Sequence, residues 1–246
     1  MCVQERVAVS PQVLERGGFL TSNTLKVIAV AAMFFDHFCS VFAVGDPVFL
    51  EWLRVPGRLA APLMCYLIAE GYWHTHDLKK YMGRLFLFAV LSHFPYVLYY
   101  HLTWWKATSV IWTLFLGLLA LTAARQPHMP FPLKLAAVGG CCLLSYPADW
   151  NYVGVLWILY FGLYHRSFGR QMASFALIGL FLHVLPNLFH FGWEHLYQCG
   201  IFLAIPLLAC YNGRRGRRSR VIKWGFYLFY PLHLLLLLGL RVITGV

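Results

Sequence analysis

Long apolar runs alternate with short polar segments along nearly the whole chain. Runs of this kind without strand alternation are typical of membrane helices, since ~20 residues rising 1.5 Å each cross a ~30 Å hydrocarbon core. Charged residues, Gly and Pro divide them into nine candidate spans, at 25–44, 57–74, 84–102, 109–124, 133–147, 152–165, 171–190, 197–211 and 223–243. The fifth and sixth are short and could be tilted, broken or partly re-entrant. The pattern predicts an all-α polytopic membrane helix bundle with about nine spans, within a range of eight to ten.

Composition supports a membrane protein. Hydrophobic residues make up 60% of the 246 positions and charged residues 12%, whereas soluble domains are about one quarter charged. No polar connection is long enough to bury a core of its own. We therefore expect an N-terminal cytoplasmic segment, 1–24, and a single transmembrane domain, 25–246. Residues 1–20 lack the continuous apolar core of a cleavable signal peptide, so we expect the N-terminus to stay in the cytoplasm.

The positive charges are divided unevenly between the two sides. With the N-terminus inside, sixteen of the 20 Lys and Arg residues fall in cytoplasmic segments, and four fall outside, at Arg54, Arg58, Lys106 and Arg241. This is the positive-inside bias of multi-pass proteins in the cell membrane. Topology thus explains the net charge of +11, and we expect a lipid bilayer rather than nucleic acid as the partner.

Asp36 and His37 stand side by side in the middle of the first span. Counted from the cytoplasmic cation of each helix, His37, His93, His183 and His233 all lie ~14 to 20 Å deep, near the midplane. Ionisable groups at that depth mark functional sites. Neighbouring helix residues point about 100° apart, so we expect Asp36 to meet a group on another helix rather than the His37 ring.

The second span carries Arg58 at its outer end and Glu70 ~18 Å further in. Arg58 could snorkel to the headgroups or form an internal ion pair. Glu70 lies in the apolar run 63–73, where a carboxylate needs a cation or a proton, and His74 one turn later is a candidate partner.

Metal chemistry is not expected. The seven cysteines are scattered without a CxxC motif, as is typical of small packing residues. The groups His74/His76/Asp77 and His190/Glu194/His195 match no common zinc pattern. We therefore expect neither a metal nor haem as a cofactor.

The ordered motifs resemble the TraX family over about residues 22 to 240. They are, in chain order, 25–26 with Asp36-His37, Gly57-Arg58-Leu59-Ala60-Ala61-Pro62, Ala69-Glu70-Gly71-Tyr72, Lys80-Tyr81 with Arg84-Leu85, Ser92 with Pro95, Ala148-Asp149 with Tyr152-Val153-Gly154-Val155, Tyr211-Asn212-Gly213 with Arg215-Gly216, and 226–233, which ends in Tyr230-Pro231-Leu232-His233.

The resemblance implies a membrane acetyltransferase. The founding type acetylates the amino terminus of conjugative pilin in the bacterial inner membrane, and related multi-span acyltransferases take acetyl groups from cytoplasmic acetyl-CoA. The family's acid-histidine pair maps onto Asp36 and His37, and its final motif onto Tyr230 to His233. Arg58 and Glu70 match the family's second-helix pair. An acidic residue commonly follows the third-helix serine, but His93 stands there, which could preserve proton handling while altering charge.

Acyl transfer from a thioester needs a base, donors to the developing oxyanion and cations for the coenzyme phosphates. We expect His37 to be the base, Asp36 or Glu70 to hold a proton or orient a partner, and Tyr230 and His233 to donate to the oxyanion. The other predicted site residues are His93 in catalysis; Arg58, Asp149 and Tyr152 for the acceptor; and Lys79, Lys80, Arg84, Asn212, Arg214, Arg215, Arg217 and Arg218 for the coenzyme. For these cations, membrane topology alone is the alternative explanation.

Other functions stay open at this point. Intramembrane Asp, Glu and His residues are also proton relays, so a proton-coupled secondary transporter is the main alternative, although no internal duplication is found. Midplane histidines from different helices could instead hold the haem of an electron carrier, and a non-enzymatic membrane partner is a further possibility. The acceptor could be a peptide amine, a glycan or a lipid, and its identity and the oligomeric state are not readable from the sequence.

Overall fold

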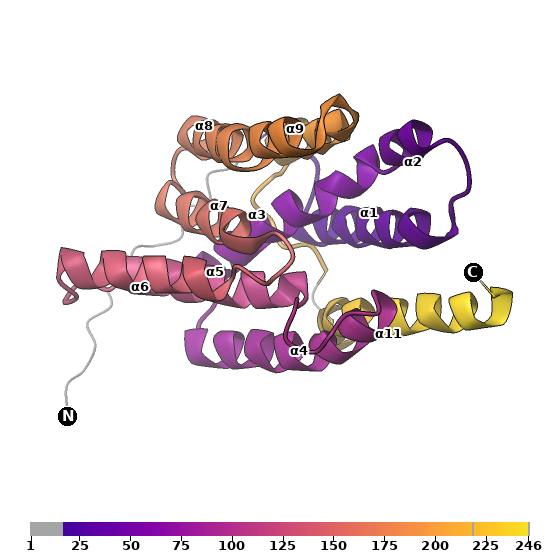
Figure 1. Cartoon of the computed structure of the whole chain (residues 1–246). Coiled ribbons are helices and arrows are strands. Elements are labelled where there is room, and N and C mark those ends of the chain that lie inside the picture. The colour runs from indigo at the N-terminus through magenta and orange to yellow at the C-terminus, as the bar shows by residue number, and fades with distance from the viewer. Residues whose placement is uncertain (1–16, 218, 246) are drawn as a thin grey trace.

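The computed structural model describes residues 17–217 and 219–245, which form helices and connecting loops (Figure 1). The elements are α1 (Ser22–Phe42), α2 (Pro47–Leu53), the 3₁₀ helix η1 (Val55–Leu59), α3 (Ala60–His74), α4 (Leu78–Tyr99), α5 (Val110–Ala124), α6 (Phe131–Leu144), α7 (Asn151–Leu163), α8 (Phe168–Gly179), the π-helical η2 (Leu180–Val184), α9 (Leu185–Phe191), the 3₁₀ helix η3 (Trp193–Leu203), α10 (Ala204–Ala209) and α11 (Arg220–Thr244). Within these residues the only β-type pairing is two isolated bridges. The predicted all-α fold is confirmed.

Side-chain caps fix where the long helices begin. The Thr21 hydroxyl accepts the Thr24 amide at 3.2 Å at the start of α1, and the Asp77 carboxylate accepts the Lys80 amide at 2.9 Å at the start of α4. Such caps satisfy amides that have no partner inside the helix. At its other end α11 stops at Gly245, which has a left-handed φ of 69°.

The predicted count of about nine spans is not confirmed. Among the described residues, four helical stretches are long and apolar enough to cross a membrane: 22–42, 78–99, 168–191 and 221–244. Three shorter apolar helices cover 110–124, 131–144 and 151–163. The predicted span 57–74 is divided into η1 and α3, and 197–211 into η3 and α10. Pro56 and Gly57 lie in η1, where both residues disfavour a continuous α-helix.

The core is formed where α5 packs against α7 and α7 packs against α3. Close approach depends on small residues, because a Cβ added at Gly117 or Gly162 would meet Ile158 or Leu121 on the facing helix. On the other side of the molecule α4 packs against α11, and the C-terminal end of α11 extends beyond its neighbours (Figure 1). These contacts leave α1, η1, α4 and α11 around the polar residues described below.

The outer surface is strongly apolar. Large side chains such as Leu91, Phe94 and Leu98 on α4, and Leu232 and Leu236 on α11, are between 46% and 56% exposed. Soluble monomers rarely expose contiguous apolar surface on this scale. The surface and the apolar helices together identify a membrane protein.

The start of α1 is paired with the loop before α11. The Leu20 amide donates to the Cys210 carbonyl oxygen at 2.9 Å, and the Asn212 amide donates to that of Leu20 at 2.9 Å. Further along, the Asn23 side-chain amide donates to the Arg217 carbonyl oxygen at 2.7 Å. This pairing holds the arginine-rich loop against one end of the helix bundle.

Candidate active site

Asp36 is the centre of an ion-pair cluster at the junction of α1 with η1. Its carboxylate accepts the Arg54 Nε–H at 3.0 Å and also pairs with the Arg58 guanidinium. The side chains of Asp36 and Arg58 are only 12% and 11% exposed. Gly57 allows this approach, because a Cβ there would collide with the Asp36 side chain. Asp36 therefore meets groups from outside its own helix, and Arg58 forms an internal ion pair instead of snorkelling.

His37 and His233 are hydrogen-bonded to each other at 2.8 Å between Nδ1 of His37 and Nε2 of His233. His233 Nδ1 lies 2.9 Å from the Phe229 carbonyl oxygen, which can only accept, so this nitrogen carries the proton. In a neutral ring His233 Nε2 is then the acceptor, and His37 Nδ1 donates to it. These partners leave Nε2 of His37 as the unprotonated nitrogen, in the form that a general base requires.

This arrangement changes one expected role. Both nitrogens of His233 are engaged, so His233 has no free N–H for an oxyanion, contrary to the sequence expectation. Instead it orients His37 and fixes its tautomer. His37 is held from a third side as well, because the Tyr99 hydroxyl donates to its backbone carbonyl oxygen at 2.6 Å.

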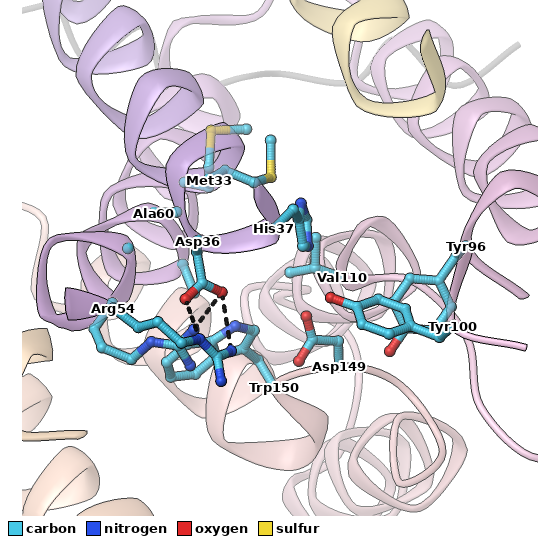
Figure 2. Close-up of a pocket in the computed structure, with 14 residues that line it drawn as sticks. Met33, Asp36, His37, Arg54, Ala60, Tyr96, Tyr100, Val110, Asp149 and Trp150 are labelled. Atoms are coloured by element: carbon cyan, nitrogen blue, oxygen red, sulfur yellow. Dashed lines mark hydrogen bonds and ion pairs between the residues drawn. The ribbon is translucent and has the colours of Figure 1, made fainter. Parts of the chain in front are cut away.

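A small cavity of about 110 Å³ opens beside His37. Figure 2 shows Asp36, Arg54 and Asp149 around it, together with the rings of Tyr96 and Tyr100. Asp149 comes from the connection between α6 and α7, and no ion pair within 4 Å is found for its carboxylate among the described residues. The cavity thus has a tyrosine wall, a paired acid and a second acid that faces the open space.

Asp149 is an unusual carboxyl group. Burial raises its pKa to about 6, although the Arg58 charge acts in the opposite direction. The following residues, Trp150 and Asn151, have positive φ values of 65° and 28°, which costs energy for residues other than Gly. Trp150 is held by the His183 ring at 4.8 Å and by the Arg58 guanidinium at 5.7 Å. Local strain therefore accompanies the placement of Asp149 in the cavity.

A larger cavity of about 430 Å³ adjoins the small one. Its polar end is lined by cations from four segments that the charge pattern places in the cytoplasm: Lys26, Arg84, Arg215, Arg217 and Lys223. Its inner end reaches Tyr230. Met33, Met64 and Val110 line both cavities, so these three side chains form the partition between them.

Glu70 lies in the wall of the larger cavity, apart from His37. Its carboxylate is 3.0 Å from Nε2 of His165 and 3.7 Å from Nδ1 of His74. The Tyr211 hydroxyl is 3.5 Å away. The buried acid thus has the expected neighbour His74 and a nearer histidine that the sequence pattern did not single out.

Several predicted residues lie away from both cavities. His93 hydrogen-bonds Thr108 at 3.1 Å, and His183 hydrogen-bonds Gln198 at 3.1 Å behind Trp150. Of the four histidines expected near the midplane, His37 and His233 hydrogen-bond each other, whereas His93 and His183 have other partners. The other predicted site residues that line neither cavity are His233, which instead contacts His37, and Tyr152, Lys79, Lys80, Asn212 and Arg214, while Arg218 lies outside the described residues.

The sequence pattern also missed residues that the fold brings into the site. Arg54 and Lys223 were visible only as loop and helix-end charges, and Lys26 only as a cation at the start of a span. The Tyr99-Tyr100 pair at the end of the third span was the one local signal for the aromatic wall. Among the described residues, no three His, Cys, Asp or Glu side chains converge as metal ligands.

Comparison with known proteins covers most of this chain. The family model described as "TraX protein" matches residues 21–241. The chain is 32% identical over 232 residues to a protein of Dichelobacter nodosus named "Probable fimbrial assembly protein FimC, serogroup H1", covering 89% of this chain and 94% of that one. No solved structure matches. The extent of the family match and the similarity to the fimbrial protein show that this chain belongs to the TraX family.

Proposed function

We propose that this protein is a multi-pass membrane acetyltransferase that moves an acetyl group from cytoplasmic acetyl-CoA to an amine of a protein acceptor such as a pilin or fimbrial subunit. The observation that carries the proposal is the buried pair of His37 and His233 beside the partition between a cation-lined cavity and a smaller acid-lined one. A base between two chambers suits transfer between a donor and an acceptor.

The larger cavity suits the donor. Its volume of about 430 Å³ is within the range of small-molecule sites. Lys26, Arg215 and Lys223 lie at its polar end and can bind phosphate groups, while its inner part is mainly apolar. An acyl thioester held there would have its phosphates near the cytoplasm and its carbonyl near Tyr230.

His37 would act as the general base. Its Nε2 accepts a proton from the acceptor nitrogen as that nitrogen forms a C–N bond with the thioester carbonyl carbon. The C–S bond then breaks, and the coenzyme leaves as a thiol that takes up the proton. His233 stabilises the transient His37 imidazolium through the hydrogen bond between the two rings, while Asp36 and its two arginines hold α1 in place.

The smaller cavity suits the acceptor. Asp149 presents a carboxyl group without an ion-pair partner, and Tyr96 and Tyr100 supply ring faces, which together favour a cationic amine. The printed name of the Dichelobacter nodosus relative concerns fimbrial assembly, which favours a protein amine over a glycan or lipid acceptor.

Incubation of the purified protein with radiolabelled acetyl-CoA and host membranes tests the proposal. We expect label in a membrane protein, at an amine identified by mass spectrometry. The His37→Ala variant should lose at least about 10²-fold in rate, as general bases contribute 10²- to 10⁴-fold. His128→Ala is the matched control, since His128 is exposed in the loop between α5 and α6.

Two outcomes would contradict the proposal. Full turnover by a folded His37→Ala variant would remove the base from the mechanism. Substrate uptake into proteoliposomes without acetyl-CoA, together with no acetylation by wild type, would favour the transporter.

A further inference from the structure

The N-terminus of α5 points to the partition between the two cavities. Val110 is the first residue of this fifteen-residue helix and lines both cavities. The preceding Ser109 makes no side-chain hydrogen bond to the first turn. Free amides at the start of a helix, together with the helix dipole, favour negative charge.

A second observation points to the same place. Tyr230 on α11 is 3% exposed, and its hydroxyl has no hydrogen-bond partner among the described residues. The Val110 backbone amide is close enough to act on the hydroxyl oxygen, although the two do not meet the geometry of a hydrogen bond. The Tyr230 ring centroid is 6.3 Å from that of His37. A buried hydroxyl without a partner is costly, so it is expected to have one when a ligand is bound.

We propose that the Val110 backbone amide and the Tyr230 hydroxyl form the oxyanion site of the acetyl transfer. This inference rests on the proposed function and adds the two donors that it needs. When the acceptor nitrogen bonds to the thioester carbonyl carbon, the C=O electron pair moves onto oxygen and makes an oxyanion. Both donors hydrogen-bond that oxygen until the carbonyl re-forms and the C–S bond breaks, with the proton passing through His37.

The geometry also explains why the base and these donors come from different helices. His37 lies on α1, Tyr230 on α11 and Val110 on α5. From these positions His37 can face the acceptor nitrogen while Tyr230 and Val110 face the oxygen of the thioester carbonyl. His233 has no free N–H, so the Tyr230 hydroxyl and the α5 amide replace it in this role.

The backbone amide can be deleted by Val110→Pro. Proline at the first position of a helix is well tolerated because that amide has no partner within the helix. Ser109 has φ −69° and ψ 159°, which is the extended conformation that a residue before proline adopts. Val110→Ala is the comparator, because it trims the side chain but keeps the N–H.

We expect Val110→Pro to lower kcat about 10²- to 10³-fold below Val110→Ala, the range for loss of one oxyanion donor, with KM for acetyl-CoA within about threefold. Tyr230→Phe removes the other donor without changing the ring and should also lower kcat about 10²-fold with little change in KM. Tyr160→Phe on α7, which lines neither cavity, controls for loss of a tyrosine hydroxyl. Thermal unfolding in detergent checks that each variant is folded.

These measurements distinguish failure of the oxyanion site from failure of the proposed acetyltransferase function. If wild type turns over acetyl-CoA while Val110→Pro equals Val110→Ala, or folded Tyr230→Phe equals wild type, the oxyanion site is wrong and the acetyltransferase stands. If Val110→Pro does not fold, Tyr230→Phe alone decides by the same kcat and KM measurement. If wild type itself transfers no acetyl group, the proposed function and this inference fail together.

Discussion

The partly buried carboxyl group of Asp149 lowers the stability of the fold when it is ionised. Asp36 already engages both Arg54 and Arg58, so Asp149 faces the small cavity without an ion-pair partner of its own. The residue is only half-buried, yet burial still raises the pKa of its carboxyl group to about 6. A group retained against this cost is a candidate for ligand binding.

The cost predicts a pH-dependent effect of Asp149→Asn. The pKa of the Asp149 carboxyl group rises from an ordinary 3.8 to about 6 on folding. Wild type therefore loses stability as pH rises through that window, and above it the loss stays constant. At 1.36 kcal/mol per pKa unit, the loss in the free energy of unfolding is at most about 3 kcal/mol, and it is smaller because the side chain is only half-buried. Relative to wild type, the Asn variant should therefore gain stability between pH 4 and pH 7.

Unfolding midpoints in detergent at pH 4.5 and pH 7.5 measure this. Glu194→Gln is the control, because Glu194 is exposed and its neutralisation relieves no burial. A difference between Asp149→Asn and wild type that is the same at both pH values would show that the carboxyl group carries no burial cost.

The elements that form the outer side of the site are short and irregular. η1 supplies Arg58 and packs against η3, while the π-helical η2 carries His183 to the back of Trp150. Segments with 3₁₀ or π geometry often occur at functional positions. Here they set the position of Arg58 relative to Asp36, and so the shape of the small cavity.

Gly200 controls the contact between η1 and η3. A Cβ at this position would lie 2.7 Å from the Val55 carbonyl oxygen and 3.2 Å from Cβ of Arg58. We expect Gly200→Ala to push η3 away from η1, to lower stability by about 1 to 3 kcal/mol, and to reduce acetyl transfer by displacing Arg58. Thermal unfolding and the acetylation rate give the two readouts.

The matched control is Gly139→Ala in α6, where an added Cβ meets nothing within 4 Å. It should leave activity unchanged, and stability unchanged or slightly higher, because alanine is the better helix former. Equal stability of the two variants would show that η1 and η3 can separate without cost.

At the scale of the whole molecule, the cation-rich segments converge on one end of the bundle. The start of α1, the start of α4, the loop with Arg215 and Arg217, and the start of α11 all contribute cations to the larger cavity. Two of the four cations assigned to the outer side, Arg54 and Arg58, are instead engaged by Asp36. Their pairing with Asp36 makes the expected charge asymmetry between the two sides sharper than the loop count alone.

This asymmetry predicts the orientation of α4 and α11. Reporter fusions after Asp77 and after Gly216 should both lie in the cytoplasm, giving green fluorescence and no alkaline phosphatase activity. A fusion after Trp105, beyond the end of α4, should give the reverse, since α4 is one of the helices long enough to cross the membrane. Alkaline phosphatase activity after Asp77, or fluorescence after Trp105, would contradict this orientation.

The sequence was enough to find some residues of the site but not their partners. Asp36, His37 and His233 stood out because ionisable side chains in apolar helices are rare and expensive. Their partners did not, because Arg54 and His165 come from short segments whose sequence reads as a loop or a helix end. His93 and His183 had the right depth, but depth along a helix does not specify the direction in which a side chain points.

The sequence by itself determined the all-α membrane fold, the charge asymmetry and the family, because apolar period, loop charge and motif order are properties of position along the chain. Only the tertiary structure decided which polar groups meet: Asp36 with two arginines, His37 with His233, and the α5 N-terminus with Tyr230. The physical reason is that such pairs depend on helix rotation, on glycines that permit close approach and on breaks such as η1. These are fixed by packing between residues that are as many as 196 positions apart.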